Sequence, residues 1–296
     1  MKEKPFSKYQ ILANAVMIIW TLAIILPFIL LFMSSITDEN TLVANGYSFF
    51  PKKFSLASYS YIIKSGGQIL KAYGVSIGVT VVGTLLNVLL SALMAYPLSV
   101  KNLPGRNVMM FFVFFTMLFN GGIVPSYIMW TGTFHIKDTI FAQLLPNFLL
   151  SAWNVMMIRT YFTTSIPDGL YEAAEIDGAS QFTIFWKIVL PLGKPILVTM
   201  GTFAGLAYWN DWTNGLYYII KNTGLYNVQN LLNQMVQNIQ FLTQSSNSNV
   251  TAAASTIPAT GIQMAIAFVA ILPIMLIFPS FQKYYAKGIA LGAVTG

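Results

Sequence analysis

The sequence contains no cysteine and only one histidine, and this scarcity removes much of the usual catalytic chemistry. Without cysteine there can be no disulfide, no thiolate metal ligand and no cysteine nucleophile. His135 alone cannot form a paired-histidine metal site, and a single loop histidine is far more often a solvated residue than a catalyst. No G-x-x-x-x-G-K-[ST] stretch is present, so the chain has no loop of the kind that cradles ATP phosphates. We therefore predict that the protein is not an enzyme and holds no metal.

Charged residues are scarce as well: Asp, Glu, Lys and Arg make up 8% of the 296 residues, whereas 56% are hydrophobic. A soluble globular domain has about a quarter charged residues, so this composition excludes that class. A helix that crosses a bilayer needs about 20 predominantly apolar residues. Stretches that reach or approach this length cover about residues 11–33, 73–100, 108–130, 140–158, 196–220 and 261–281. We therefore predict an all-α integral membrane protein in which residues 1–296 form a single transmembrane domain of six helices.

The charges that are present indicate how the chain is oriented. If the N-terminus lies in the cytoplasm, ten Lys and Arg residues fall in cytoplasmic segments and six fall on the other side. This bias agrees with the positive-inside rule, so we predict a multi-pass protein with both termini in the cytoplasm. The net charge of +7 then reflects loop residues at a membrane surface, and we predict no nucleic-acid partner.

Polar side chains inside the apolar stretches are candidates for contact with a polar solute. Asp211 interrupts the fifth stretch, and acids within a membrane usually face the bundle interior or water. The surrounding "YWNDWTNGLYY" combines aromatic rings, which can pack on the flat faces of sugars, with amides that can bond hydroxyl groups. The alternative is an interfacial aromatic belt with a satisfied acid at a helix end. The candidates are Asn120, Trp153, Asn154, Tyr208, Trp209, Asn210 and Asp211.

Two further segments depart from a simple pattern of spans. The third stretch contains "FNGGIVP" at residues 119–125, and such Gly and Pro residues are tolerated in a span where the backbone is buried or lines a cavity. Between residues 221 and 260, apolar side chains recur every three or four positions, which indicates an amphipathic helix. This helix could pack on the bundle or offer a docking surface to an extracellular partner.

A polar, regularly patterned segment, "EAAEIDGASQFTIFWKIVLP", lies in the middle of the chain at residues 172–191. Ser165 could cap a short helix that runs to about Asp177. Gly178 would break this helix, and a second helix would begin at Ser180 and end near Pro191. We therefore predict a helix–Gly–helix hairpin on the cytoplasmic side, a shape that another protein can grip.

The same segment resembles a known signature. E-A-A, three residues, G, nine residues and I-x-L-P form the loop typical of permeases of ABC importers, and here it reads Glu172-Ala173-Ala174, Gly178 and Ile188-Val189-Leu190-Pro191. "IDGA", "WND" and the tail "KYYAKGIALGAVTG" are similar to the carbohydrate-uptake branch of that family. "FNGGIVPSYI" is similar to permeases, of the second-permease type, that import oligosaccharides or polysaccharide fragments. The resemblance covers nearly the whole chain; Gly169 and the ending Val-Thr-Gly are small departures.

The resemblance implies a type I ABC importer permease fold with a cytoplasmic coupling helix. Residues 165–195 would then form the coupling loop, and the helix within it would enter a groove on a cytoplasmic ATPase. The coupling residues would be Glu172, Ala173, Ala174, Asp177, Gly178 and Ala179. ATP and Mg²⁺ would bind at the ATPase, so this chain itself would hold no cofactor.

The resemblance also implies a set of partners in the bacterial cytoplasmic (inner) membrane. These would be a second homologous permease subunit, two copies of the ATPase, an extracytoplasmic sugar-binding protein or lipoprotein, membrane lipid and an oligosaccharide substrate. The alternative is a secondary transporter driven by an ion gradient, which would need inverted repeats and intramembrane ionisable residues. The sequence shows neither beyond Asp211, which favours the ATP-driven importer.

Overall fold

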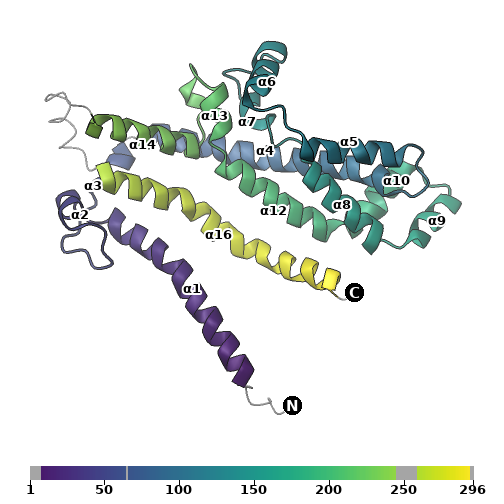
Figure 1. The fold of residues 1–296 in the computed structure, drawn as a ribbon, viewed down its shortest axis with the longest axis horizontal. Helices are drawn as coiled ribbons and strands as arrows, with labels where there is room; N and C mark the ends of the chain where they lie inside the picture. Colours follow the sequence, from purple (N-terminus) through teal and green to yellow (C-terminus); the bar gives the residue numbers. More distant parts are fainter. Residues whose placement is uncertain (1–7, 65, 245–258, 294–296) are drawn as a thin grey trace. The chain divides into compact units, whose positions relative to one another are not determined.

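The computed structural model describes residues 8–64, 66–244 and 259–293, and in these ranges the chain folds into helices and connecting segments without a β-strand (Figure 1). The α-helices are α1 (Lys8–Ser35), α2 (Glu39–Asn45), α3 (Ala57–Lys64), α4 (Gly66–Ser99), α5 (Arg106–Leu118), α6 (Ile123–Ile128), α7 (Phe141–Leu144), α8 (Ala152–Ser165), α9 (Asp168–Ile176), α10 (Gln181–Ile184), α11 (Leu190–Leu192), α12 (Lys194–Asn210), α13 (Thr213–Tyr218), α14 (Val228–Gln244) and α16 (Ala259–Ala293). The π-helical turns η1 (Met129–Thr133) and η2 (Phe185–Val189) and the 3-10 turn η3 (Thr223–Leu225) lie between them. The chain divides into two compact units.

The first unit contains residues 1–69 and 232–273. Its core is a small apolar cluster from α3 and the first part of α16, made of Ile62, Ile262, Ala265 and Ile266. The start of α16 is capped from α2, because the two carboxylate oxygens of Glu39 accept the N–H groups of Thr260 and Gly261 at 2.9 and 2.8 Å. A negative charge is favoured at this position because the free N–H groups and the helix dipole make a helix N-terminus positive.

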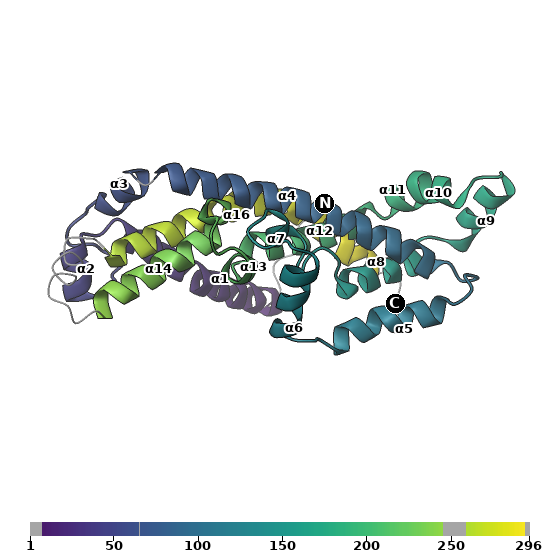
Figure 2. The same ribbon diagram turned by 90° about the horizontal axis from the view of Figure 1, so that it is seen from above.

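The second unit contains residues 70–231 and 274–296 and holds the larger core. Within it α4, α5 and α8 run alongside one another (Figure 2). Small residues of α4 let α8 and the hairpin after it pack closely against α4. The fully buried members of this core include Ala92, Ala95, Val155, Ile158, Phe162, Ile184 and Val189. The same core therefore fixes both α8 and the segment at residues 165–195.

Within the described ranges, two helices are long and apolar enough to cross a membrane, namely α1 and the Gly67–Ser99 part of α4. They contain the expected spans at 11–33 and, to within a residue, 73–100. Two bent helix pairs raise the number to four if each pair counts as one span. The apolar part of α16, Thr260–Leu276, is shorter. The expected number of six spans therefore stays a prediction.

The expected continuous helix over residues 108–130 is wrong. α5 ends at Leu118, a new helical segment begins at Ile123, and the two segments are bent by 111°. Between them Gly122 has a φ of +86°, which glycine adopts without the strain that a side chain would add. The "FNGG" sequence, which already departed from the pattern of a simple span, thus turns the chain sharply.

The expected helix over residues 140–158 is also wrong as a single element. The structure has the short α7 and the longer α8, separated by a segment at 145–151 that is not helical. Pro146 cannot donate a backbone hydrogen bond, and Asn147 has a φ of +67°. The chain therefore leaves the helical path in the middle of an apolar run.

Candidate functional site

The segment predicted to form a hairpin folds as one. α9 is followed by a tight turn and a second helical run that begins with α10. The second run begins at Ser180, as predicted, and Ser180 caps it, since its hydroxyl accepts the N–H of Thr183 at 3.2 Å. The cap predicted at Ser165 is wrong, because α8 continues through that residue. The hairpin is thus a separate element placed directly after α8.

The turn of the hairpin is a Schellman motif, a helix end that is satisfied by its own backbone. The N–H of Ala179 donates to the carbonyl of Ala174 at 2.9 Å, and the N–H of Gly178 donates to that of Glu175 at 3.0 Å. Gly178 has a φ of +75°, a left-handed conformation that costs other residues about 1–2 kcal/mol. The glycine of the E-A-A signature is therefore favoured by backbone geometry.

Side chains on one side of the hairpin fasten it to the end of α4. The Tyr96 hydroxyl donates to Oε1 of Gln181 at 2.6 Å, and Nε2 of Gln181 donates to Oε1 of Glu175 at 2.8 Å. The rings of Tyr96 and Tyr171 stack with their centroids 6.5 Å apart. Ala174 is buried in the same core. These contacts hold α9 in one position against the second unit's core.

The other side of the hairpin is exposed and partly apolar. Ile176 is 86% exposed and Phe182 is 68% exposed. Of the predicted coupling residues, Ala174 is buried and Ala179 is half-buried, while the exposed ones are Glu172, Ala173, Asp177 and Gly178. Apolar side chains on a fixed projection form a surface that a partner protein can cover.

A second group of predicted residues lies where the fifth apolar stretch breaks, so the expected helix over 196–220 is two helices, α12 and α13. Asp211 lies between them and is 5% exposed. Its Oδ1 accepts the N–H and the hydroxyl of Thr213 at 3.0 and 2.7 Å and the N–H of Asn214 at 3.3 Å. This carboxylate thus caps α13. Its other oxygen, Oδ2, is buried without a hydrogen-bond partner among the described residues.

Buried amides surround this break and form, with the aspartate, a polar junction made of Gln143, Asp211, Asn214, Asn227 and Asn230. Nδ2 of Asn227 donates to the backbone carbonyl of Asp211 at 2.6 Å, and Nδ2 of Asn214 donates to that of Pro146 at 3.1 Å. Carbonyl groups released where a helix ends must find other partners when they are buried. The polar junction therefore supplies hydrogen-bond partners to backbone carbonyl groups at the breaks in both the fourth and the fifth stretches.

Asn154 and Tyr208, both predicted to meet the solute, are buried and bonded in the same region. Nδ2 of Asn154 donates to Oδ1 of Asn87 at 2.7 Å, and Nδ2 of Asn87 donates to the carbonyl of Phe148 at 2.6 Å. The Tyr208 hydroxyl donates to the carbonyl of Leu144 at 2.9 Å. Both side chains therefore support the non-helical part of the fourth stretch.

The remaining predicted residues do not gather at one place. Asn120, Trp153 and Asn210 are exposed, and Oδ1 of Asn120 accepts a backbone N–H in the turn before α6 at 2.8 Å. Trp209 is 7% exposed, and its Nε1 is buried without a partner in the part of the chain that is described. Buried polar atoms are normally bonded, so Trp209 and Asp211 each have a group that a ligand or water could satisfy.

Sequence reasoning missed five buried amides, namely Asn87, Gln143, Asn214, Asn227 and Asn230. The signal was present for Asn87, which is the one amide in the apolar run "GTLLNVLLSALMAY". It was also present for Gln143 and Asn214, which lie within the fourth and fifth stretches. Asn227 and Asn230 lie between the fifth and sixth stretches, where polar residues are ordinary. No group of three or more His, Asp or Glu side chains within the described ranges could hold a metal.

Known proteins resemble this chain over most of its length. Residues 73–291 match the family described as "Binding-protein-dependent transport system inner membrane component". Protein LplC of Bacillus subtilis (strain 168) is 36% identical over 272 residues, which are 92% of this chain and 90% of LplC. The polygalacturonan/rhamnogalacturonan transport system permease protein YtcP of the same organism is 35% identical over 288 residues, covering 97% and 98%.

A solved structure is also similar. It is the crystal structure of a bacterial ABC transporter involved in the import of the acidic polysaccharide alginate. One chain of that transporter aligns over its full length with 96% of the present chain, with a TM-score of 0.79 and 26% sequence identity. The similarity therefore extends over both units of the chain.

Proposed function

Because the chain belongs to the family of binding-protein-dependent transport system inner membrane components, we propose that it is the permease through which an ATP-driven importer takes up an oligosaccharide. Proteins of this kind are components of the membrane channel and not enzymes, so ATP hydrolysis falls to a separate subunit. Two similar proteins, one a polygalacturonan/rhamnogalacturonan permease and one a transporter involved in alginate import, support a fragment of a polysaccharide as the substrate.

The observation that carries the proposal is the fixed hairpin with its exposed apolar side. In the proposed importer α9 is the coupling helix and sits in a groove of the cytoplasmic ATPase, which covers Ile176 and the exposed residues of the E-A-A signature. Two ATPases that close on ATP and Mg²⁺ draw together this helix and its counterpart on a second permease. Because the hairpin shares a core with α8, its displacement moves the transmembrane helices.

The proposed complex contains a second homologous permease, two ATPase subunits and an extracytoplasmic sugar-binding protein or lipoprotein. This chain crosses the bacterial cytoplasmic membrane six times and keeps both termini in the cytoplasm. The bent pair of the third stretch then counts as one span, α12 with α13 forms the fifth span, and α8 and α16 supply the others. The most apolar part of α1 is not buried in the chain, which supports a surrounding of lipid or of a second permease.

The path of the substrate passes, in this proposal, beside the break between α12 and α13. Trp209 and Asp211 are the best contacts because each has a buried polar atom without a partner in the described residues. Asn154 and Tyr208 instead bond other parts of the chain, so they shape the path. The exposed predicted residues, Asn120, Trp153 and Asn210, line it only where a second permease encloses them.

Uptake measured in proteoliposomes tests the proposal. The chain is reconstituted with its partner permease, ATPase and binding protein, and radiolabelled pectin or alginate oligosaccharides are offered on the side of the binding protein. We expect uptake that needs ATP and continues after ionophores collapse all ion gradients. Uptake that runs on an imposed proton or sodium gradient without ATP would instead establish the secondary transporter.

A further inference from the structure

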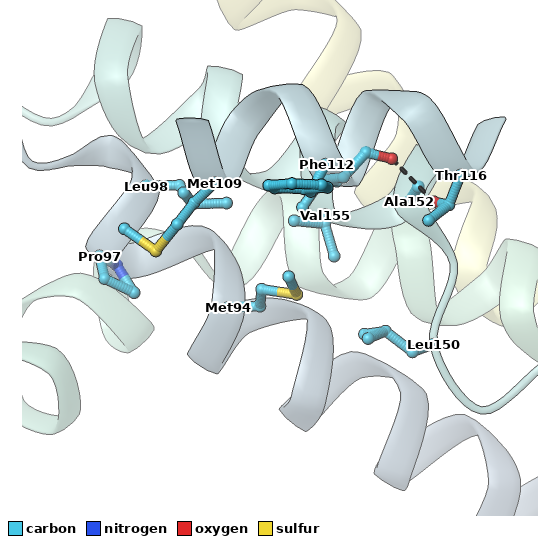
Figure 3. A pocket seen from close by; sticks show the side chains of 10 residues that line it. Met94, Pro97, Leu98, Met109, Phe112, Thr116, Leu150, Ala152 and Val155 are labelled. Carbon is cyan, nitrogen blue, oxygen red and sulfur yellow. Dashed lines mark hydrogen bonds between the residues drawn. The ribbon is translucent and has the colours of Figure 1, made fainter. Parts of the chain in front are cut away.

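An open apolar pocket of about 480 Å³ lies between α4, α5 and α8 of the second unit (Figure 3). Its walls include Met94, Leu98, Met109, Phe112, Leu150 and Val155. The hydroxyl of Thr116, which also lines the pocket, donates to the carbonyl of Val113 in its own helix at 2.8 Å. The wall is therefore almost entirely apolar, and a ligand that fills it must be apolar too.

The pocket is open at its surface and its lining can adapt. Phe112 is 62% exposed, Leu150 is 46% exposed and Met109 is 41% exposed. The side chains of Met94 and Met109 both face the pocket (Figure 3). Methionine side chains are flexible and polarisable, so they adjust to ligands of irregular shape. A flexible hydrocarbon chain could enter between α5 and the loop before α8.

Two arginines lie beside one end of this pocket. Arg159 is on α8, four residues after Val155 and so on the same helix face, and its Nε donates to the carbonyl of Leu98 at 3.2 Å. Arg106 is the first residue of α5, three residues before Met109. Because Leu98 and Met109 both line the pocket, the two arginines lie at the same end of it.

This pair of positive charges has no counter-charge within the described ranges of the chain. The ion pairs found there are Lys53–Asp38 and Lys101–Asp168, so the other cation of this region, Lys101, has its own acid. Arg159 is half-buried, and a partly desolvated cation beside a like charge is unfavourable. An anion placed between the two arginines would remove this cost.

We propose that the pocket binds one anionic phospholipid, with an acyl chain between α4, α5 and α8 and its phosphate between Arg106 and Arg159. Basic pockets between transmembrane helices on the cytoplasmic side bind anionic head groups, and the guanidinium fork matches two phosphate oxygens. The inference rests on the proposed function in one respect, since that function places this end of α5 and α8 at the cytoplasmic membrane surface. The lipid would join α5 to α8 next to the coupling hairpin.

Charge and apolar lining together favour a lipid over a second permease as the occupant. A protein would have to bring an acidic side chain to the arginines and an apolar side chain into the pocket from one surface. A phospholipid carries both groups in one flexible molecule, and it is present wherever the chain is inserted. The two occupants differ in the experiment that follows.

The test uses the complete importer in phosphatidylcholine nanodiscs that contain a small fraction of phosphatidylglycerol with a photoactivatable group on an acyl chain. After illumination, mass spectrometry locates the labelled peptides. We expect label on residues 94–116 and 150–155. Unlabelled phosphatidylglycerol should compete and phosphatidylcholine should not. Arg106→Gln and Arg159→Gln should each lower the yield about fivefold, as expected for the loss of one basic contact with an anionic lipid.

Two further variants separate the charge from the pocket. Lys101→Gln is the matched control, because Lys101 is an exposed cation near the same membrane surface but is paired with Asp168; its yield should change less than about twofold. Ala152→Phe fills the pocket and leaves both arginines in place, so it should lower the yield on its own. Labelling that is unchanged when both arginines are replaced, or equal competition by phosphatidylcholine, would overturn the proposal.

The remaining outcomes are also decisive. Labelling of the isolated chain that disappears in the assembled importer would identify the second permease as the occupant, and the lipid site would be rejected. Uptake and ATP hydrolysis are measured on the same nanodiscs. Import that fails while labelling still follows the arginines contradicts the proposed function alone. Import that proceeds while labelling ignores the arginines contradicts the lipid site alone.

Discussion

The hairpin of α9 and α10 and the polar junction around Asp211 both interrupt an apolar chain, but they satisfy the broken backbone in different ways. The hairpin closes with two backbone hydrogen bonds around Gly178 and leaves side chains such as Ile176 exposed. The polar junction uses side-chain amides and a carboxylate, and these groups are buried.

This difference separates a surface made for a partner from a bend that is part of the fold. A turn that its own backbone satisfies leaves its side chains free to meet another protein. A turn that side chains satisfy holds those side chains in place, so they are costly to change. We therefore expect substitutions in the hairpin to affect coupling before stability, and substitutions near the polar junction to affect stability first.

The largest effect is expected at Gly178. Gly178→Val places a branched side chain at a φ of +75°, which should distort the turn and move the exposed side of the hairpin. Transport in the reconstituted importer should fall about five- to thirtyfold, which corresponds to a loss of about 1–2 kcal/mol in coupling. Substrate-stimulated ATP hydrolysis should fall with it. Helices α8 and α12 should remain folded, as judged by an unchanged yield of the permease pair.

Gly169 supplies the matched control for this substitution. It lies in the same helix, α9, and a Cβ there would meet open space. Gly169→Ala should therefore keep transport within about twofold, since alanine favours a helix over glycine. A Gly178→Val importer that takes up sugar at the wild-type rate would show that the hairpin is not the coupling element.

The second largest effect is expected where α4 meets the end of α12. A Cβ on Gly83 would lie 2.5 Å from the ring of Tyr208, the buried tyrosine that bonds Leu144. Gly83→Ala should destabilise the permease by about 1–3 kcal/mol through overpacking, measured as a lower temperature of half-aggregation in detergent. Gly78→Ala, one and a half turns away in open space, is the control and should not lower it.

Substitutions of Asp211 test whether the aspartate acts as a helix cap or as a contact for the solute. Asp211→Ala removes the acceptor for the N–H groups at the start of α13 and should cost about 1 kcal/mol of stability. Asp211→Asn keeps an oxygen acceptor, so stability should stay near the wild-type value. If Asp211→Asn also keeps full transport, the carboxylate charge is not needed by the substrate, and the proposed contact at this residue is wrong.

The smallest effect is expected at Asp138, a half-buried aspartate whose carboxylate also accepts hydrogen bonds from backbone groups. Its Oδ1 accepts the N–H groups of Ile220, Lys221 and Asn222 at 2.7, 2.7 and 3.2 Å. The N–H of Lys221, with those of Ile220 and Asn222, holds the pKa of Asp138 below its ordinary value, although desolvation opposes this. A lowered pKa stabilises the folded chain above the unfolded value of about 3.9, and this stability is lost as the pH falls through the folded pKa.

Melting temperatures measured from pH 7 to pH 3 test this prediction. Wild type should melt at a slightly higher temperature than Asp138→Asn at neutral pH, because the asparagine does not titrate and binds the N–H groups less strongly. The difference should shrink as the pH falls below about 4. A difference that does not depend on pH would mean that the carboxylate charge does not hold this connection.

The hairpin was predictable because its signals are local. The break at Gly178 and the start of the second helix at Ser180 depend on residues within a few positions of each other, and the sequence indicated both. The cap predicted at Ser165 failed because α8 extends through that residue and α9 begins only at Asp168.

The break in the fourth apolar stretch was not predicted, because apolar character sets the environment of a segment and not its backbone path. The fourth stretch stays apolar through Pro146, yet it leaves the helix there. What makes the break stable is distant in sequence: Asn214 bonds the carbonyl of Pro146, and Asn87 bonds that of Phe148. Such partners become visible only when the helices are packed.

The hydrogen bonds of Glu39 determine how early the first unit can be completed while the chain is being synthesised. Its carboxylate caps α16 by accepting the N–H of Thr260, a residue 221 positions later in the chain. At about 5–20 residues per second, the ribosome needs roughly 10 to 45 s to make that partner. During this interval α2 has been made but its carboxylate lacks the helix end that it caps. The first unit therefore cannot be completed until nearly the whole chain has been synthesised.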